Sequence, residues 1–418
     1  MRRKTVSSVL VAMCVLAGVA CGDDDSPDSS AGADAGDDNG GGSGGELELS
    51  EPLRIGGLVE IAGESPAAVD TFNNGFELAV EEINAAGGVG GQEIEYTREP
   101  LSIFDPARAQ SQFLALLDSE PSVIVGIPSN TQFGPLKSQI DRAQTPVIAI
   151  APLSDAARFG GDEGSEYLWT MMPASVSSAG LAATFLAEEL GAERIGFMAT
   201  DEQFGNTGIA AGEAALEELG LEPVANRQHA PDASDLTADI VEMEGADVDA
   251  IFDWDFPNPL ATLLNQLVQN GLEVPVISGE STPLVVDNEL ATGDALANLH
   301  SIGSCFPSSE SATPELKDFR QRYLDAYDAE PNGGATHAYD SIYVIKAAVE
   351  AAGSADPAAI NEALADLTVT EDVACQEEYV ADGSHGMAHS LSIVAYETDG
   401  TRSIVQTYAI DPLDAVDG

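Results

Sequence analysis

Apolar and polar residues form two kinds of pattern, which alternate along the chain. Short, mostly apolar runs indicate strands, and longer stretches with apolar residues three or four positions apart indicate helices. Before position 151 the pattern predicts strands over 53–58, 93–98, 122–127 and 147–150, and helices over 73–84, 105–117 and 134–143. Pro106 directly follows Asp105 at the start of the second helix, where both residue types are favoured.

A second series of the same kind begins after position 177. It predicts helices over 178–190, 208–219, 236–244 and 260–270, and strands over 194–199, 222–226, 250–253 and 274–278. Alternation of strands with helices is typical of the α/β class with parallel sheets. Two similar series indicate two lobes, and ligands of open α/β sheets bind outside the carboxyl ends of the strands. We therefore expect a binding cleft between the lobes.

The N-terminal segment differs from the rest. Three basic residues precede an apolar run over 9–20, and no acidic residue occurs before Cys21. This pattern is typical of an export signal, assigned to residues 1–20. The run is shorter than the roughly 20 apolar residues that a membrane-spanning helix needs, so we expect a soluble mature body. Residues 21–51 are rich in Gly, Asp and Ser and are predicted to be a flexible acidic tether.

The stretch from Leu16 to Gly22 resembles a bacterial lipoprotein signal, in which the first mature residue is a lipidated cysteine. This resemblance implies cleavage before Cys21 and a lipid anchor on it. The usual leucine three places before the cysteine is Gly18 here. A plain secretory signal with cleavage nearby is the alternative.

Charge narrows the possible partners. The 418 residues include 71 acidic and 16 basic side chains, which gives a formal charge of −55. Such a chain is repelled by phosphate backbones, so we expect no nucleic-acid partner. With 44% hydrophobic residues it still has enough apolar material for sizeable cores. Self-repulsion of the acidic surface makes a saline habitat a reasonable hypothesis.

Two cysteines remain in the body once Cys14 leaves with the signal and Cys21 takes lipid. These are Cys305 and Cys375, and a pair in an exported protein indicates a disulfide. Closing this loop of 71 residues would contribute at most about 4 kcal/mol in the chain-entropy model. Two unbonded buried thiols are the alternative.

Residues 79–91, AVEEINAAGGVGG, resemble the helix-and-turn signature of the type I periplasmic binding proteins, specifically the leucine/isoleucine/valine-binding branch. Further matching segments follow in that family's order at 123–131, 145–155, 201–205, 279–280 and 338–340. The resemblance covers about residues 52–410. It implies an α/β fold with two Rossmann-like lobes joined by a three-stranded hinge.

The resemblance also implies the domain boundaries. We expect the chain to cross between the lobes near Pro173, Ile302 and Ala388. The N-terminal lobe then comprises residues 52–173 plus 303–388, and the C-terminal lobe comprises 174–302 plus 389–411. Residues 412–418 are a tail.

An amino acid offers a carboxylate, which hydroxyls and backbone N–H groups bind, and an ammonium, which needs an acceptor. In the resembling family the turn at Ser129, Asn130 and Thr131 donates to the carboxylate, although such residues also cap helices. The next loop, at Leu153, Ser154 and Asp155, supplies a backbone carbonyl and a hydroxyl. Asp155 departs from that hydroxyl, which Ser154 supplies if the loop is shifted by one residue.

The second lobe offers three candidate ligand contacts. Phe204 stands where the family often has a tyrosine over the ligand, and Glu280 matches the carboxylate that binds the ammonium. Trp254, after a strand, either shapes the pocket or belongs to the core. A count back from the first helix places Ala68 where the family often has a large aromatic residue, which puts a branched-chain preference in doubt.

Enzymatic chemistry has little support in the sequence. No phosphate loop of the GxxxxGK type is present. His385 and His389 are four residues apart, but Gly383 and Gly386 argue against a helix that would bring them together. We therefore expect no catalytic residues, no cofactor and no metal.

The sequence thus predicts a lipid-anchored, extracytoplasmic substrate-binding protein of an ABC importer. It would bind an amino acid or related small amide between its lobes by hinge closure, as a monomer, and pass it to a membrane permease. The alternative is an extracellular sensor of the same fold that reports to a signalling partner.

Overall fold

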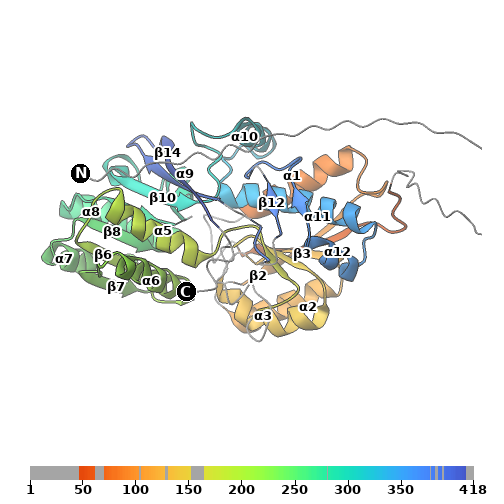
Figure 1. Cartoon of the computed structure of the whole chain (residues 1–418), viewed down its shortest axis with the longest axis horizontal. Helices are drawn as coiled ribbons and strands as arrows, with labels where there is room; N and C mark the ends of the chain where they lie inside the picture. Colours follow the sequence, from red (N-terminus) through yellow and green to blue (C-terminus); the bar gives the residue numbers. More distant parts are fainter. Residues whose placement is uncertain are drawn as a thin grey trace, which may run out of the picture. The chain divides into compact units, whose positions relative to one another are not determined.

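The computed structural model describes residues 47–61, 70–102, 105–127, 130–151, 164–279, 281–376, 378–381, 385–387 and 390–410 (Figure 1). Within these residues, no helix is both long enough and apolar enough to cross a membrane.

The first sheet has five parallel strands in the order β2-β1-β3-β4-β5. They are β1 (Arg54–Glu60), β2 (Glu95–Leu101), β3 (Val123–Gly126), β4 (Val147–Ala149) and β5 (Leu168–Thr170). Every residue of β3, β4 and β5 is buried. Parallel strands buried on both faces read as continuous apolar runs, which is why the sequence pattern predicts β3 and β4 well.

Two apolar clusters cover the two faces of this sheet. One cluster joins Ile124 and Val147 to α2 (Pro106–Leu117) and α3 (Asn130–Ala143). The other joins Val123 and Ile148 to helices from both ends of the chain. These are α1 (Thr71–Ala85), α10 (Pro314–Tyr327), α11 (Gly333–Ala352) and α12 (Pro357–Leu364), beside the two-stranded sheet of β11 (Thr368–Val369) and β12 (Tyr379–Val380).

The second sheet has seven strands in the order β14-β13-β10-β9-β8-β6-β7. Its parallel part comprises β6 (Ile195–Thr200), β7 (Ala225–His229), β8 (Ala250–Trp254), β9 (Val276–Ser278) and β10 (Leu299–Gly303). The last two strands, β13 (Ser390–Tyr396) and β14 (Arg402–Ala409), are antiparallel. The C-terminal segment therefore closes one edge of this sheet.

Helices also cover both faces of the second sheet. One cluster packs α5 (Ser175–Glu188) and α6 (Gln203–Glu218) on Phe197 and Phe252. The other packs the remaining helices on Ile251 and Val276. These are α7 (Thr237–Gly245), α8 (Pro257–Asn270), α9 (Ser281–Asp287) and the 3-10 helix η1 (Gly293–Leu296).

Local sequence signals explain several element ends. Asp105 caps α2, because its side chain accepts hydrogen bonds from the backbone N–H groups of Ala107 and Arg108 at 3.1 Å.

Strand β7 begins at Ala225, three residues later than the predicted strand over 222–226. It lies at the edge of its sheet and alternates half-buried with exposed positions up to the buried His229, so its polar residues continue the strand where the apolar pattern ends.

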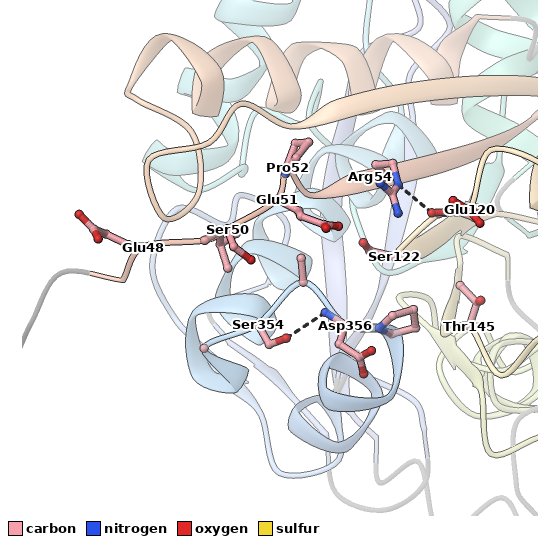
Figure 2. A pocket seen from close by; sticks show the side chains of 15 residues that line it. Glu48, Ser50, Glu51, Pro52, Arg54, Glu120, Ser122, Thr145, Ser354 and Asp356 are labelled. Atoms are coloured by element: carbon pink, nitrogen blue, oxygen red, sulfur yellow. Dashed lines mark hydrogen bonds between the residues drawn. The ribbon is translucent and has the colours of Figure 1, made fainter.

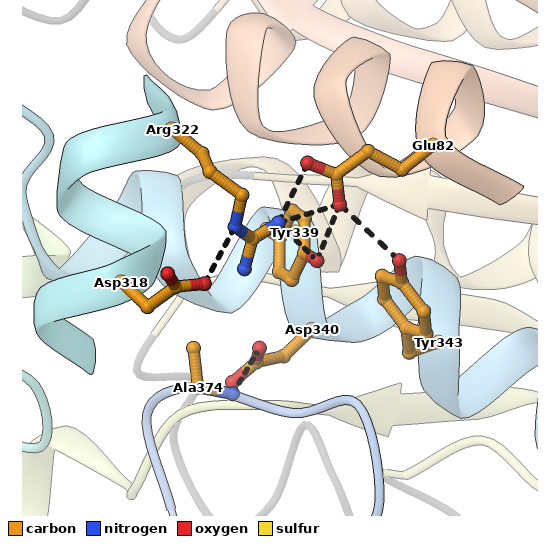
Figure 3. A network of polar contacts seen from close by, with 7 residues as sticks. All are labelled: Glu82, Asp318, Arg322, Tyr339, Asp340, Tyr343 and Ala374. Carbon is orange, nitrogen blue, oxygen red and sulfur yellow. Dashed lines mark hydrogen bonds and ion pairs between the residues drawn. The ribbon is translucent and has the colours of Figure 1, made fainter. Parts of the chain in front are cut away.

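A polar network joins three helices that are far apart in the sequence (Figure 3). Arg322 of α10 donates from Nη1 to Glu82 of α1 at 2.6 Å and to the hydroxyl of Tyr339 at 2.8 Å. Tyr339 and Tyr343 of α11 both donate to the same Glu82 oxygen, at 2.7 and 3.3 Å. The network is half-buried and ties α1 to the later helices α10 and α11.

Helices α1 and α11 also approach each other closely at Gly75. A Cβ atom at this position would lie 2.2 Å from the backbone carbonyl oxygen of Ala335. We predict that Gly75→Ala lowers the free energy of unfolding by about 2 kcal/mol or more, because a backbone atom has little freedom to move away. Thermal unfolding measures the loss.

Gly134→Ala is the matched control, because Gly134 lies within helix α3 and a Cβ there meets nothing within 4 Å. This variant should be neutral or more stable by up to about 1 kcal/mol, since alanine is the better helix former. Equal destabilisation by both substitutions would contradict the close approach at Gly75.

Candidate functional site

The parallel strands of the second sheet bring a group of polar side chains to one edge. Strands β6, β7, β8 and β9 end at Thr200, His229, Trp254 and Ser278. Because parallel strands share the direction of their carboxyl ends, these positions and the residues just beyond them lie at the edge where such folds bind ligands. We call Thr200, Glu202, His229, Asp253, Asp255 and Ser278 the carboxyl-edge cluster.

The carboxylic acids of this cluster are deeply buried. Asp253 is 0% and Asp255 1% exposed. The two residues are two positions apart in an extended segment, so their side chains share one face. The Ser278 hydroxyl donates to Asp253 at 2.8 Å. His229 Nε2 lies 3.0 Å from Asp255 Oδ2.

Burial controls the protonation of the cluster. It raises the pKa of Asp253 well above its ordinary range, and the neighbouring Asp255 adds to this effect. It also raises the pKa of Asp255 to about 7 and raises the pKa of Glu202, while lowering the pKa of His229. Burial thus favours the protonated form of these carboxyl groups and the neutral form of the His229 imidazole.

Among the residues that the structure describes, no three His, Cys, Asp or Glu side chains are arranged to hold a metal ion. The carboxyl groups contact other polar side chains instead: Asp253 accepts from the Ser278 hydroxyl, and Asp255 lies beside His229.

Aromatic rings lie beside the cluster. Phe204 stacks on Phe256 with ring centroids 5.5 Å apart and lies 5.8 Å from Trp254. Phe204 and Phe256 are partly exposed, whereas Trp254 is buried. The indole of Trp254 packs against Gly208, where an added Cβ would come within 2.2 Å of the ring. Trp254 therefore forms the base of an aromatic group whose accessible members are Phe204 and Phe256.

The other candidate ligand contacts lie at less well described positions. Asn130 and Thr131 are the first two residues of α3, at the carboxyl end of β3, and only their backbone is described. The remaining candidates lie outside the described residues: Ser129, Leu153, Ser154, Asp155 and Glu280. Of the predicted contacts, the structure thus brings Phe204 and Trp254 together and leaves the rest as predictions.

The first sheet carries a groove of about 600 Å³ at the end opposite to the carboxyl ends of its strands (Figure 2). Arg54 at the start of β1 donates there to the carbonyl oxygen of Glu120 at 2.8 Å, and Ser122 and Thr145 precede β3 and β4. None of the predicted ligand contacts lines this groove. It lies at the amino ends of the strands, the edge away from the expected binding site.

Cys305 and Cys375 are both thiols in the structure, and no disulfide joins them. The two thiols nevertheless interact with each other. The disulfide therefore stays a prediction.

Sequence reasoning missed Asp253, Asp255, His229 and Glu202. One signal was available, because Asp253 interrupts the apolar strand AIFDW, every residue of which is buried. A carboxyl group in such a strand needs partners nearby.

Comparison with known proteins shows consistent similarities. The family model described as "Periplasmic binding protein" matches residues 52–401. The Leu/Ile/Val-binding protein homolog 7 of Brucella abortus is 22% identical over 338 residues, which cover 78% of this chain and 84% of that protein. An amino acid binding protein of Pseudomonas aeruginosa is 23% identical over 307 residues, which cover 72% and 80% of the two chains.

Solved structures show the same architecture. The branched-chain amino acid transporter substrate binding protein LivJ from Streptococcus pneumoniae, in complex with isoleucine, has a TM-score of 0.74 and 22% identity, covering 86% of this chain and 99% of that one. A solute binding protein from R. palustris, in complex with benzoate, has a TM-score of 0.76 and 15% identity, covering 86% and 97%.

We predict that Asp255→Asn changes how stability depends on pH. An aspartate with a pKa near 4 when unfolded and about 7 when folded stabilises the fold fully below pH 4, and this contribution falls as pH rises to 7. In the unmodified protein the stability lost over this pH range is on the order of 4 kcal/mol. The asparagine variant has no carboxyl group at this position and does not lose this stability. Its melting temperature should therefore rise relative to the unmodified protein between pH 5 and pH 8.

The neighbouring His229 acts in the opposite sense, because its lowered pKa costs stability as pH falls below its ordinary value. For this reason the measured quantity is the difference between variant and unmodified protein at each pH. Asp201→Asn, an exposed acid just beyond β6, is the control and should leave that difference unchanged. A pH-independent difference for Asp255→Asn would contradict burial of an ionisable carboxyl group.

Proposed function

Because the chain belongs to the periplasmic binding protein family, we propose that it is the extracytoplasmic substrate-binding component of an ABC importer. It is a binding protein rather than an enzyme, and its partners are a small-molecule ligand and a membrane permease. Solved structures whose titles name transporter substrate-binding proteins support this function over the sensor alternative. The observation that carries the proposal is the family match across both sheets.

We further propose that the two sheets form two lobes. We assign residues 52–173 plus 303–388 to the N-terminal lobe and residues 174–302 plus 389–411 to the C-terminal lobe. In support, residues 305–387 contribute to the apolar cluster of the first sheet, whereas β13 and β14 belong to the second. Ligand that contacts both lobes stabilises the closed state by its higher affinity for that state.

The ligand is an amino acid or a related small amide. The names of the relatives support this class. So does the chemistry of the second sheet's edge, where residues 200–206, 229–231, 253–256 and 278–282 include four acids besides Glu280 and no Lys or Arg. Carboxyl groups accept hydrogen bonds from ammonium or amide N–H groups and disfavour an anionic group on this side.

Each predicted ligand contact has a role in this proposal. The carboxylate of the ligand would be held by Ser129, Asn130 and Thr131, with Ser154 in the adjacent loop at Leu153 and Asp155. Glu280 would accept from the ammonium. Phe204 would cover the ligand, over the buried ring of Trp254.

We also propose that the mature chain is a monomer with a lipid anchor on Cys21, followed by the tether of residues 21–51. About 25 Gly-rich residues have a root-mean-square span of roughly 25 to 30 Å as a random coil. The body would thus stay near the membrane and remain free to rotate.

Ligand binding is tested by thermal shift on the chain from residue 21 onward, with Cys21→Ser. The panel comprises amino acids, small amides, urea, short peptides and benzoate, at low and high salt. A ligand at 100 times its Kd should stabilise the protein by about 2.7 kcal/mol, a shift of a few degrees. We expect amino acids or amides to give this shift and benzoate to give none.

Glu280→Ala should abolish the shift of an amino acid without lowering the melting temperature of the unliganded protein. Glu273→Ala is the matched control, because Glu273 is an exposed acid before the opposite end of the same strand, β9. Binding of benzoate but of no amino acid or amide would overturn the proposed ligand class.

The lipid anchor is tested by expressing the full chain in a bacterial host. The unmodified protein should sediment with membranes, and Cys21→Ala should move it to the soluble extracytoplasmic fraction, because the acyl chains are lost. Cys14→Ala, within the signal, should leave the membrane fraction unchanged. Membrane association of Cys21→Ala equal to that of the unmodified protein would exclude the anchor.

A further inference from the structure

Cys305 lies where the chain passes from the second sheet to the helices of the first, and Cys375 lies near it in space. Cys305 follows the end of β10 at Gly303 by two residues, in the second of the three crossings between the lobes. Cys375 lies between β11 and β12. The inference below rests on the proposed export of the protein, because export takes these thiols to an oxidising compartment.

The backbone holds both cysteines against α11. A Cβ atom on Gly333, the first residue of α11, would lie 3.4 Å from the Cβ atom of Cys305 and 2.6 Å from its carbonyl oxygen. On the other side, the backbone N–H groups of Ala374 and Cys375 donate to the Asp340 carboxylate of α11 at 2.8 and 2.9 Å. The positions of both residues are therefore fixed by the same helix.

The side chains bring the two thiols together. The Cys375 thiol donates to the carbonyl oxygen of Ser304, the neighbour of Cys305, at 3.4 Å. It also interacts directly with the Cys305 thiol. Cys305 is buried and Cys375 partly buried. The Cys375 sulfur thus lies against the backbone of the residue next to Cys305.

Buried polar groups surround the pair. His337 of α11 has Nε2 at 2.6 Å from the Ser304 hydroxyl and at 3.6 Å from the Cys375 sulfur. Gln376 donates to the Ser304 carbonyl oxygen at 3.2 Å and accepts from the Ser390 hydroxyl at 2.8 Å. The chain leaves the second sheet at Ser304 and returns to it at Ser390. Residues 375–376 contact both positions and therefore hold the second and third crossings together.

We propose that Cys305 and Cys375 form a disulfide that fixes the second crossing to α11 and the loop before β12. Oxidation proceeds by thiol–disulfide exchange with a disulfide oxidant. One thiolate attacks the oxidant, releases a thiolate from it and forms a mixed disulfide. The second cysteine, after losing its proton, displaces the remaining thiol of the oxidant. Two cysteine thiols and one disulfide thus give one protein disulfide and two thiols.

The order of events follows from burial. Burial raises the pKa of the Cys375 thiol, which disfavours the thiolate that exchange requires. The bond therefore forms while the chain folds, before α11 and the loop enclose the sulfurs. Protein folded in the reduced state should acquire it slowly.

The experiment uses the chain from residue 21 onward with Cys21→Ser, so that Cys305 and Cys375 are its two cysteines. It is refolded with reduced and oxidised glutathione, or with dithiothreitol, then alkylated, digested without reduction and analysed by mass spectrometry. We expect a linked peptide pair containing both cysteines after glutathione refolding and two alkylated peptides after dithiothreitol. The oxidised form should also melt about 5 °C higher, because the bond restricts the unfolded chain.

The double variant Cys305→Ala/Cys375→Ala is the control and should melt at the same temperature under both conditions. If it fails to fold, the comparison of oxidised and reduced unmodified protein still decides the question. Two alkylated cysteines after glutathione refolding would overturn the disulfide while leaving ligand binding intact. A disulfide present in a protein that binds no ligand would overturn the proposed function alone.

Discussion

The constraint on which the rest of the structure depends is burial of the parallel strands on both faces. Strands β3, β6 and β8 have no exposed residue, and a separate apolar cluster lies on each side of each sheet. Polar chemistry is thereby displaced to the strand ends, where loops and helix starts supply free N–H groups. The candidate ligand contacts follow strands in the sequence because this is where such a fold admits them.

The same constraint decides which elements the sequence predicts. Helices with one apolar side, such as α1 and α2, and fully buried strands such as β8 have the expected periods and are found within a few residues of their ends. Helix α11 has no such period, because its neighbours bury 14 of its 20 residues, including His337 and Asp340. Its position depends on packing against α1 and α12, and a pattern within its own sequence cannot predict such contacts.

The residues of the candidate site also divide into those that the sequence predicts and those that it does not. Phe204 and Trp254 follow from a resemblance in sequence order, and their rings do lie together. The contact between His229 and Asp255 has no local signal, because the pairing of β6 with both β7 and β8 places their ends close in space. Only Asp253, an acid within an apolar strand, indicates from sequence alone that this edge is unusual.

Composition explains how the buried acids are accommodated. With 16 basic side chains for 71 acids, few carboxylates gain a cationic partner. Arg402 pairs with Asp287 and Arg322 with Glu82, but Asp340 relies on two backbone N–H groups and the Tyr379 hydroxyl. The pKa of Asp340 rises to about 6 even so. Asp253 accepts from the Ser278 hydroxyl and lies close to Asp255, and burial raises the pKa of both carboxyl groups. A chain so poor in cations places its buried acids beside N–H donors or other carboxyl groups, which occur together at strand ends and in loops against helices.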